Sequence, residues 1–315
     1  MLSKLNYRII LCLLICGLVG FNLVQAAPSL FAYLLTALGL GLRHGLDADH
    51  IVIIDNITRK LAHQKKPSST TGLFFAAGHS TIVFIMTLAI VLGLNHTSGY
   101  FEKITQFGNS FGALVSITFL AITLILNLLM IQSIKQSDGT SGQIRRGLSY
   151  RIYSRYILNA IDSPYKMYFV GFLFGLGFDT ATEIGLLALA ATSLFQGVSG
   201  YLILLLPVAF ACGMVMTDTA NSTFMSRIYT QVQNNQQKLK LYNYIILGFA
   251  SLVTLLVILI ELVGYLKDQF AIHTPSLIMI GKLDDNSELI GSSIACVFMV
   301  LGLIVYSILL NNRKA

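Results

Sequence analysis

The chain has 315 residues, of which 55% are hydrophobic and only 11% are charged, and its mean hydropathy is +0.73. A soluble globule of this length needs more polar residues to cover its surface, so the composition excludes a soluble protein and places the chain in a lipid bilayer. The net charge of +7 does not indicate nucleic-acid binding, because the basic residues are spread along the chain without a recognition motif.

Eight stretches are long and apolar enough to cross a bilayer, which takes about 20 residues per helix. We therefore predict an all-α integral membrane protein with about eight transmembrane helices in a single domain over residues 1–315. The stretches cover residues 9–26, 30–54, 72–94, 109–134, 167–193, 200–226, 241–265 and 289–310.

The first stretch also resembles a signal peptide, because Lys4 and Arg8 precede an apolar run that ends in Val24-Gln25-Ala26-Ala27. We expect this stretch to be retained as a helix; its cleavage would leave seven. The long hydrophilic segment 135–166 is basic and too short to bury a core of its own. It is predicted to be a cytoplasmic connector between two halves.

The distribution of basic residues predicts the orientation in the cell (cytoplasmic) membrane. An even number of helices places both termini on one side, and nearly all Lys and Arg residues fall on that side. The exceptions are Lys103, Lys267 and Lys282 on the opposite side and Arg43 within a span. Under the positive-inside rule, both termini are therefore cytoplasmic.

The first of four polar clusters is Arg43-His44-Gly45-Leu46-Asp47-Ala48-Asp49-His50, deep in the second stretch. An ionised side chain at the bilayer centre costs about 2.5–3.5 kcal/mol, so such a cluster marks a site or a pathway. On a continuous helix, Arg43, Asp47 and His50 project within about 60° of one another, with His44 about 60° further. Two imidazoles and a carboxylate are then expected to converge.

The donor atoms of this cluster predict the kind of ion. Imidazole nitrogen and carboxylate oxygen suit nickel, cobalt, copper or zinc better than magnesium or calcium, which favour oxygen ligands alone. Asp49 projects elsewhere and is expected to contact a neighbouring helix, and Arg43 is expected to balance the carboxylates. Interhelical hydrogen bonding is the alternative, but four ionisable groups beside Arg43 exceed what it requires.

Three further clusters lie in later stretches. Gly78-His79-Ser80-Thr81 adds an imidazole, although a lone histidine on an apolar helix is more often a satisfied core residue. In Phe178-Asp179-Thr180-Ala181-Thr182-Glu183, two carboxylates four positions apart repel unless a cation or proton lies between them. The glycines around this third cluster permit a close approach or a local helix break. Asp218-Thr219-Ala220-Asn221-Ser222 adds another carboxylate, with a capped or kinked helix as its alternative.

The two halves of the chain share a faint similarity. Segment 41–48 is similar to segment 175–180, with Asp47 and Asp179 132 positions apart, and Gly78 corresponds to Gly213, 135 positions later. This offset spans three helices, an odd number, so the matching elements cross the membrane in opposite directions. The pattern is typical of an inverted 3+3 repeat of helices 2–4 and 5–7, with the substrate site at the repeat interface.

Together the four clusters resemble the motifs of the nickel/cobalt transporter family of high-affinity nickel permeases. The resemblance covers the helix number and the motif order of the whole chain. The first motif lies in Arg43–Asn56, with a His-x-x-x-x-Asp-His pattern at His44, Asp49 and His50. The second lies in Gly72–Val83, with a Phe-Phe...Gly-His-Ser motif. The third, Phe-Asp-Thr-Ala-Thr-Glu, lies in Gly177–Ile184, and the fourth, Gly-Met...Asp-Thr, lies in Gly213–Ser222.

The resemblance implies high-affinity uptake of nickel or cobalt across the cytoplasmic membrane. One departure is that Asn221-Ser222 stands where the family motif usually continues with Asp-Gly, so an acidic group is missing. This difference is expected to bear on affinity or ion preference. We predict as metal-binding residues His44, Asp47, Asp49, His50, His79, Asp179, Glu183 and Asp218, and as supporting residues Arg43, Ser80, Thr180, Thr182, Thr219 and Asn221.

The chain has no phosphate-binding loop, so it is expected to be a secondary permease without ATP hydrolysis, driven by protons or by the membrane potential. Nickel or cobalt is its substrate, and neither a resident cofactor nor a nucleotide or nucleic-acid partner is expected. An intramembrane metalloenzyme would need a motif such as His-Glu-x-x-His, which is absent. A carrier of an organic solute gives no reason for two nearby histidines. An exporter shares the site chemistry and stays open, as does the oligomeric state.

Overall fold

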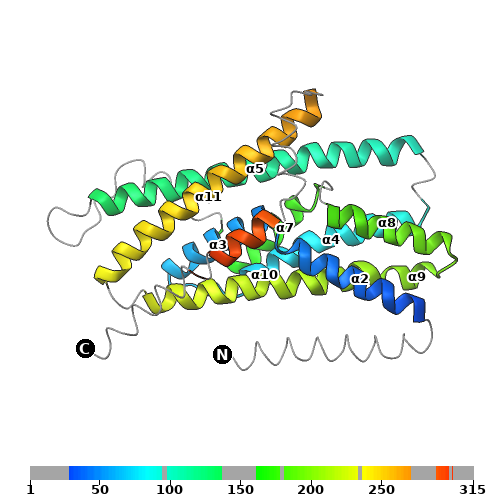
Figure 1. Cartoon of the computed structure of the whole chain (residues 1–315), viewed down its shortest axis with the longest axis horizontal. Coiled ribbons are helices and arrows are strands. Elements are labelled where there is room, and N and C mark those ends of the chain that lie inside the picture. Colours follow the sequence, from blue (N-terminus) through cyan, green and yellow to red (C-terminus); the bar gives the residue numbers. More distant parts are fainter. Residues whose placement is uncertain are drawn as a thin grey trace.

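The computed structural model describes residues 28–93, 98–136, 161–177, 181–232, 236–270, 289–297 and 300, and the regular structure in these ranges is helical (Figure 1). The predicted first span, most of the connector and the last part of the eighth span lie outside the described residues. The elements are α2 (Pro28–His44), α3 (Ala48–His63), α4 (Thr71–Val91), α5 (Ser98–Gln136), the 3-10 helix η2 (Pro164–Lys166), α7 (Met167–Phe174), α8 (Ala181–Phe195), α9 (Gly200–Ile203), α10 (Leu205–Val232) and α11 (Gln236–Phe270).

Four described segments are long and apolar enough to cross a membrane on their own, by length and composition. They confirm the expectation of an all-helical protein with several spans. α5 and α11 extend beyond the predicted stretches and pack against each other where they cross (Figure 1). The four segments are Thr71–Val91, Ser110–Leu129, Gly200–Thr230 and Leu247–Lys267.

The second predicted span is interrupted, so the expectation of a continuous helix through the first cluster was wrong. α2 ends at His44, and α3 begins at Ala48 after a turn. Asp47 is extended at φ −62° and ψ 148° and caps α3, its Oδ1 accepting a 2.7 Å hydrogen bond from the Ala48 amide. His44 and His50 therefore belong to two half-helices, and the angles of a single helix do not relate them.

The fifth predicted span is interrupted as well. α7 ends at Phe174, and the described part of α8 begins at Ala181, so the glycine-containing segment between them is not part of either described helix. Each of the two interrupted spans therefore has a half-helix that ends near the middle of the bundle and a second one that starts there. This arrangement brings polar backbone ends and polar side chains into the apolar interior.

Glycines bring pairs of helices into backbone contact. A Cβ atom on Gly41 of α2 would lie 2.0 Å from the carbonyl oxygen of Phe210 on α10, and one on Gly78 of α4 would lie 1.9 Å from that of Tyr168 on α7. Real side chains do not fit at such distances, so glycine is required at both crossings. α2 with α10 and α4 with α7 are therefore two tightly packed helix pairs (Figure 1).

One helix of each pair, α4 and α10, can be compared in direction. At the start of α4, a Cβ atom on Gly72 would lie 2.0 Å from the Asp218 carbonyl oxygen of α10. At its other end, Val91 lies against Gly200, the first residue of α9, which precedes α10. α4 is therefore antiparallel to α10, and both interrupted spans meet between the two pairs.

Candidate metal site

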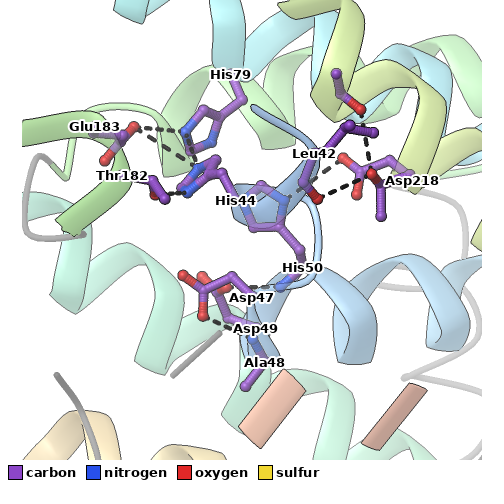
Figure 2. A network of polar contacts seen from close by, with 12 residues as sticks. Leu42, His44, Asp47, Ala48, Asp49, His50, His79, Thr182, Glu183 and Asp218 are labelled. Atoms are coloured by element: carbon purple, nitrogen blue, oxygen red, sulfur yellow. Dashed lines mark hydrogen bonds and ion pairs between the residues drawn. The ribbon is translucent and has the colours of Figure 1, made fainter. Parts of the chain in front are cut away.

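Three donor atoms from three helices converge between the two helix pairs. His44 Nε2 at the end of α2 lies 3.0 Å from His79 Nε2 of α4, and His79 Nε2 lies 2.8 Å from Glu183 Oε1 of α8. The third side, from His44 Nε2 to Glu183 Oε1, is 3.9 Å long. All three side chains are buried, and Figure 2 shows them pointing toward one another.

The three distances fit a bound first-row cation. The triangle is nearly right-angled at His79, so the midpoint of its longest side is about 2.0 Å from His44 Nε2 and Glu183 Oε1 and about 2.1 Å from His79 Nε2, which are ordinary metal–ligand distances. One point is thus at bonding distance from two imidazole nitrogens and one carboxylate oxygen.

His50 adds a third imidazole from the start of α3. Its ring centroid lies 4.7 Å from that of His44 and 5.0 Å from that of His79, and one ligand atom of each of the three histidines lies within 4.8 Å of those of the other two. His50 Nδ1 is 3.5 Å from Asp218 Oδ2 of α10, which is fully buried. No hydrogen bond joins these two atoms, but Nδ1 faces the Asp218 carboxylate, which leaves Nε2 as the ring atom available to a cation.

Thr182 fixes the protonation of His44. The fully buried Thr182 hydroxyl lies 3.1 Å from His44 Nδ1. Without a bound ion, the network is satisfied when His79 Nε2 donates to the Glu183 carboxylate, which only accepts, and the His44 proton sits on Nδ1, donating to Thr182. His44 Nε2 then keeps its lone pair directed at the centre of the triangle. His79 Nε2 binds a cation only after it has lost the proton that it donates to Glu183.

The sequence model of the high-affinity nickel-transport proteins, the NicO family, matches residues 30–309. The chain belongs to this family. The predicted function is thereby confirmed: this is a multi-pass membrane transporter of nickel and not an enzyme.

Several curated proteins are similar over most of their length. The nickel transporter NicT of Mycobacterium tuberculosis is 38% identical over 80% of this chain and 72% of its own. The nickel transporter NixA of Staphylococcus aureus is 33% identical over 96% of this chain and 93% of its own. The cobalt transport protein NhlF of Rhodococcus rhodochrous is 33% identical over 83% and 78%. No solved structure matches the chain.

The remaining predicted carboxylates of this NicO protein have different positions. Asp47 and the half-buried Asp49 each accept a 2.7 Å hydrogen bond from the backbone amide of the following residue, at the start of α3. Figure 2 shows them beside His50, away from the triangle of donors. They place negative charge at a helix N-terminus, where it is stabilised. Asp179 and Thr180 lie outside the described residues.

The predicted supporting residues divide in the same way. Thr182 contacts His44, whereas the buried hydroxyls of Ser80 and Thr219 accept and donate no hydrogen bond among the described residues. Arg43 is exposed at the end of α2, and Asn221 is partly buried on α10. The structure therefore gathers part of the predicted set, with Thr182 as its best-placed supporting member.

Sequence reasoning missed Thr217, which stabilises the end of α2. Its Oγ1 lies 3.1 Å from the Leu42 carbonyl oxygen and 3.2 Å from that of Gly213. Leu42 is in the last turn of α2, where carbonyls lack a helical partner and need another donor in an apolar interior. A single threonine on an apolar helix does not indicate a functional position, so only the neighbouring Asp218 pointed to this part of α10.

Proposed function

We propose that the transporter holds its cation between His44 Nε2 and Glu183 Oε1, with His79 Nε2 at the corner, during passage through the membrane. The observation that carries this proposal is the triangle of these three atoms, whose centre is at bonding distance from each. The donors belong to α2, α4 and α8, so the bound ion would join three helices.

His50 is the fourth donor in this proposal, and Asp218 is the carboxylate that orients it. The 3.5 Å separation of His50 Nδ1 and Asp218 Oδ2 supports this role, since carboxylates commonly orient a metal-binding imidazole through its other nitrogen. Asp47 and Asp49 contribute charge that attracts a cation. Asp179 stays a predicted ligand, as its spacing from Glu183 indicated.

The shape of the triangle favours nickel over zinc. In a tetrahedral site with ordinary bond lengths, every pair of donors lies about 3.3 Å apart, and two donors 3.9 Å apart do not fit. Donors at opposite ends of a line with a third at a right angle are the beginning of a square-planar or tetragonal site, which suits nickel(II) and copper(II). We expect cobalt as the second substrate, in line with the name of a cobalt-transporting relative.

The helix crossings support the predicted inverted repeat. α2 meets α10 where a Cβ on Gly41 would lie 2.0 Å from the Phe210 carbonyl oxygen, and α7 meets α4 where one on Gly171 would lie 2.0 Å from that of Phe75. Gly41 and Gly171 are 130 positions apart, and Phe75 and Phe210 are 135 apart. An offset of 130 to 135 positions therefore relates α2 to α7 and α4 to α10, as expected for a repeat.

A second pair of contacts follows the same register. A Cβ on Gly213 would lie 2.3 Å from the Leu38 carbonyl oxygen, and one on Gly78 would lie 1.9 Å from that of Tyr168. Leu38 and Tyr168 are again 130 positions apart, and Gly78 and Gly213 are 135 apart. Because the corresponding helices α4 and α10 run in opposite directions, we propose that the two pairs rock against each other around the metal site.

We further propose eight spans with both termini in the cytoplasm, as the basic residues predict. The membrane potential then drives uptake of a divalent cation with about 4.6 kcal/mol per 100 mV, without ATP. Proton coupling is the alternative driving force. Nickel uptake into proteoliposomes with an imposed potential and no pH gradient separates the two.

The experiment that tests the site is uptake of radioactive nickel by cells that express the full chain, with excess cobalt, zinc or manganese as competitor. Glu183→Gln removes the negative charge but keeps the shape, and His63→Gln changes a histidine at the end of α3 as matched control. We expect loss of uptake in the first variant, wild-type uptake in the second, and weaker competition by zinc than by cobalt.

Two results would contradict this proposal. Wild-type uptake in Glu183→Gln, with equal amounts of protein in the membrane, would remove the carboxylate from the site. Competition by zinc as strong as by cobalt would contradict the tetragonal arrangement while leaving the nickel-transport function intact.

A further inference from the structure

Two phenylalanines cover the site histidines from different helices. The Phe75 ring of α4 packs edge-on against His50, with centroids 4.7 Å apart, and the Phe210 ring of α10 lies 5.4 Å from His44. Both phenylalanines are fully buried. Neither offers an atom that binds a transition metal, so the ligand chemistry does not account for them.

The two rings lie on opposite sides of the site along the bundle. His44 ends α2 and His50 begins α3, so each ring covers the histidine of a different half of the interrupted span. Phe75 is one turn closer to the start of α4 than His79, and Phe210 lies near the start of α10. Because α4 and α10 are antiparallel, Phe75 and Phe210 lie toward opposite ends of the bundle.

Both phenylalanines also lie at the helix crossings. The Phe75 carbonyl oxygen contacts Gly171 of α7, and the Phe210 carbonyl oxygen contacts Gly41 of α2. A change in tilt between the helices of one pair therefore moves the backbone that carries the ring. The two crossings are equivalent in the proposed repeat. If a movement at one crossing displaces its phenylalanine ring, the equivalent movement at the other crossing displaces the other ring.

We propose that Phe75 and Phe210 are paired gating residues, each closing one of the two routes to the metal site, and that transport opens them alternately. This inference rests on the proposed function, because the gates serve the site between His44, His79 and Glu183. A buried aromatic ring leaves no path for a hydrated cation, so with both rings in place the site is closed toward both ends. A transporter whose routes opened together would let the ion leak.

The test measures access to a cysteine at the site from each side of the membrane. His44→Cys is introduced in the full chain after Cys12, Cys16, Cys212 and Cys296 have been replaced by serine. A charged, membrane-impermeant thiol reagent is then applied to right-side-out and to inverted vesicles, and the labelling rate is measured in combination with Phe75→Ala or Phe210→Ala.

We expect each truncation to raise the labelling rate by at least about tenfold from one side only, because it opens one route without the other. Phe210→Ala should act from the side at which α10 begins, and Phe75→Ala from the side at which α4 begins. Phe75→Leu and Phe210→Leu keep most of the bulk and should restore slow labelling.

Leu120→Ala is the control for truncation itself, because Leu120 is fully buried on α5 within an apolar cluster. Unchanged labelling in both phenylalanine variants, or an equal rise from both sides in either, would overturn the gates. Labelling does not require transport. Sided labelling of the cysteine variant, together with wild-type nickel uptake by Glu183→Gln in a chain that keeps His44, would refute the proposed metal site and keep the gates.

Discussion

His44 and His79 face each other through their Nε2 atoms, 3.0 Å apart, although they are 35 positions apart in the chain. Both rings are buried, and His79 Nε2 also lies 2.8 Å from Oε1 of the Glu183 carboxylate. The contact between His79 Nε2 and Glu183 lowers the cost of burying these groups, but His79 Nδ1 has no hydrogen-bond partner among the described residues, and ionisable groups gathered in an apolar interior mark a site. We therefore expect substitution of His79, or of the residue that contacts His44 Nδ1, to weaken nickel binding.

His79→Gln should abolish high-affinity uptake. The change removes one of the donors, and since altering an outer-shell partner alone costs about 10–100-fold in metal affinity, we expect the apparent KM for nickel to rise by more than about 100-fold. Initial rates over a range of nickel concentrations measure this, with membrane protein quantified by immunoblot. A KM within a factor of a few of wild type would exclude His79 as a ligand.

Thr182→Val should weaken nickel binding through His44. Valine matches threonine in shape but cannot accept a hydrogen bond from His44 Nδ1. The proton of His44 is then no longer held on Nδ1, and Nε2 loses its preference for the unprotonated form that binds a cation. We expect the apparent KM for nickel to rise about 10–100-fold. Thr182→Ser restores the hydroxyl and should return KM most of the way. A defect in Vmax that serine does not rescue would instead indicate a role in packing.

The chemistry of the site could be predicted from the sequence because ionisable residues within apolar spans are costly and therefore conspicuous. His44, His50, His79 and Glu183 were all found in this way, and the structure brings them together. Their relative geometry could not be predicted. Gly45 and the N-cap residue Asp47 are local signals of the break between α2 and α3, but the apolar stretch around them contains no proline and indicates one continuous helix.

The interruption depends on contacts that are distant in sequence. Thr217 of α10 satisfies a carbonyl at the end of α2, and Gly291 packs against the turn that follows, where a Cβ would lie 1.9 Å from the Leu46 carbonyl oxygen. A membrane span is predicted from the residues of that stretch alone, so contacts with other helices do not influence where a break is expected. Phe75 belongs to the Phe-Phe...Gly-His-Ser motif and no signal marks Phe210, so their packing against the histidines could not be predicted.

Gly291→Ala should impair transport although residue 291 lies outside the metal site. The added methyl overlaps the backbone of Leu46 and Ala48, so the turn before His50 must move. Gly248→Ala on α11 is the matched control, because no heavy atom lies within 4 Å of its Cβ position. We expect reduced nickel uptake and a lower melting temperature in detergent for the first variant only; equal behaviour of the two would contradict this packing.

Gly41→Ala and Gly171→Ala should have similar, severe effects, since each methyl would lie 2.0 Å from a carbonyl oxygen of the paired helix. Overpacking of this kind typically costs about 1–3 kcal/mol and sometimes more. Gly39→Ala, also on α2, is the control, because a Cβ at this position would lie in open space. This change should be neutral, or should stabilise the protein by up to about 1 kcal/mol, because alanine has a higher helix propensity than glycine. Thermal unfolding in detergent and nickel uptake measure both effects. If the helix pairs are equivalent, the two damaging variants lose stability and uptake together; a harmless Gly171→Ala beside a damaging Gly41→Ala would contradict the inverted repeat and, with it, the rocking of two matched pairs around the ion.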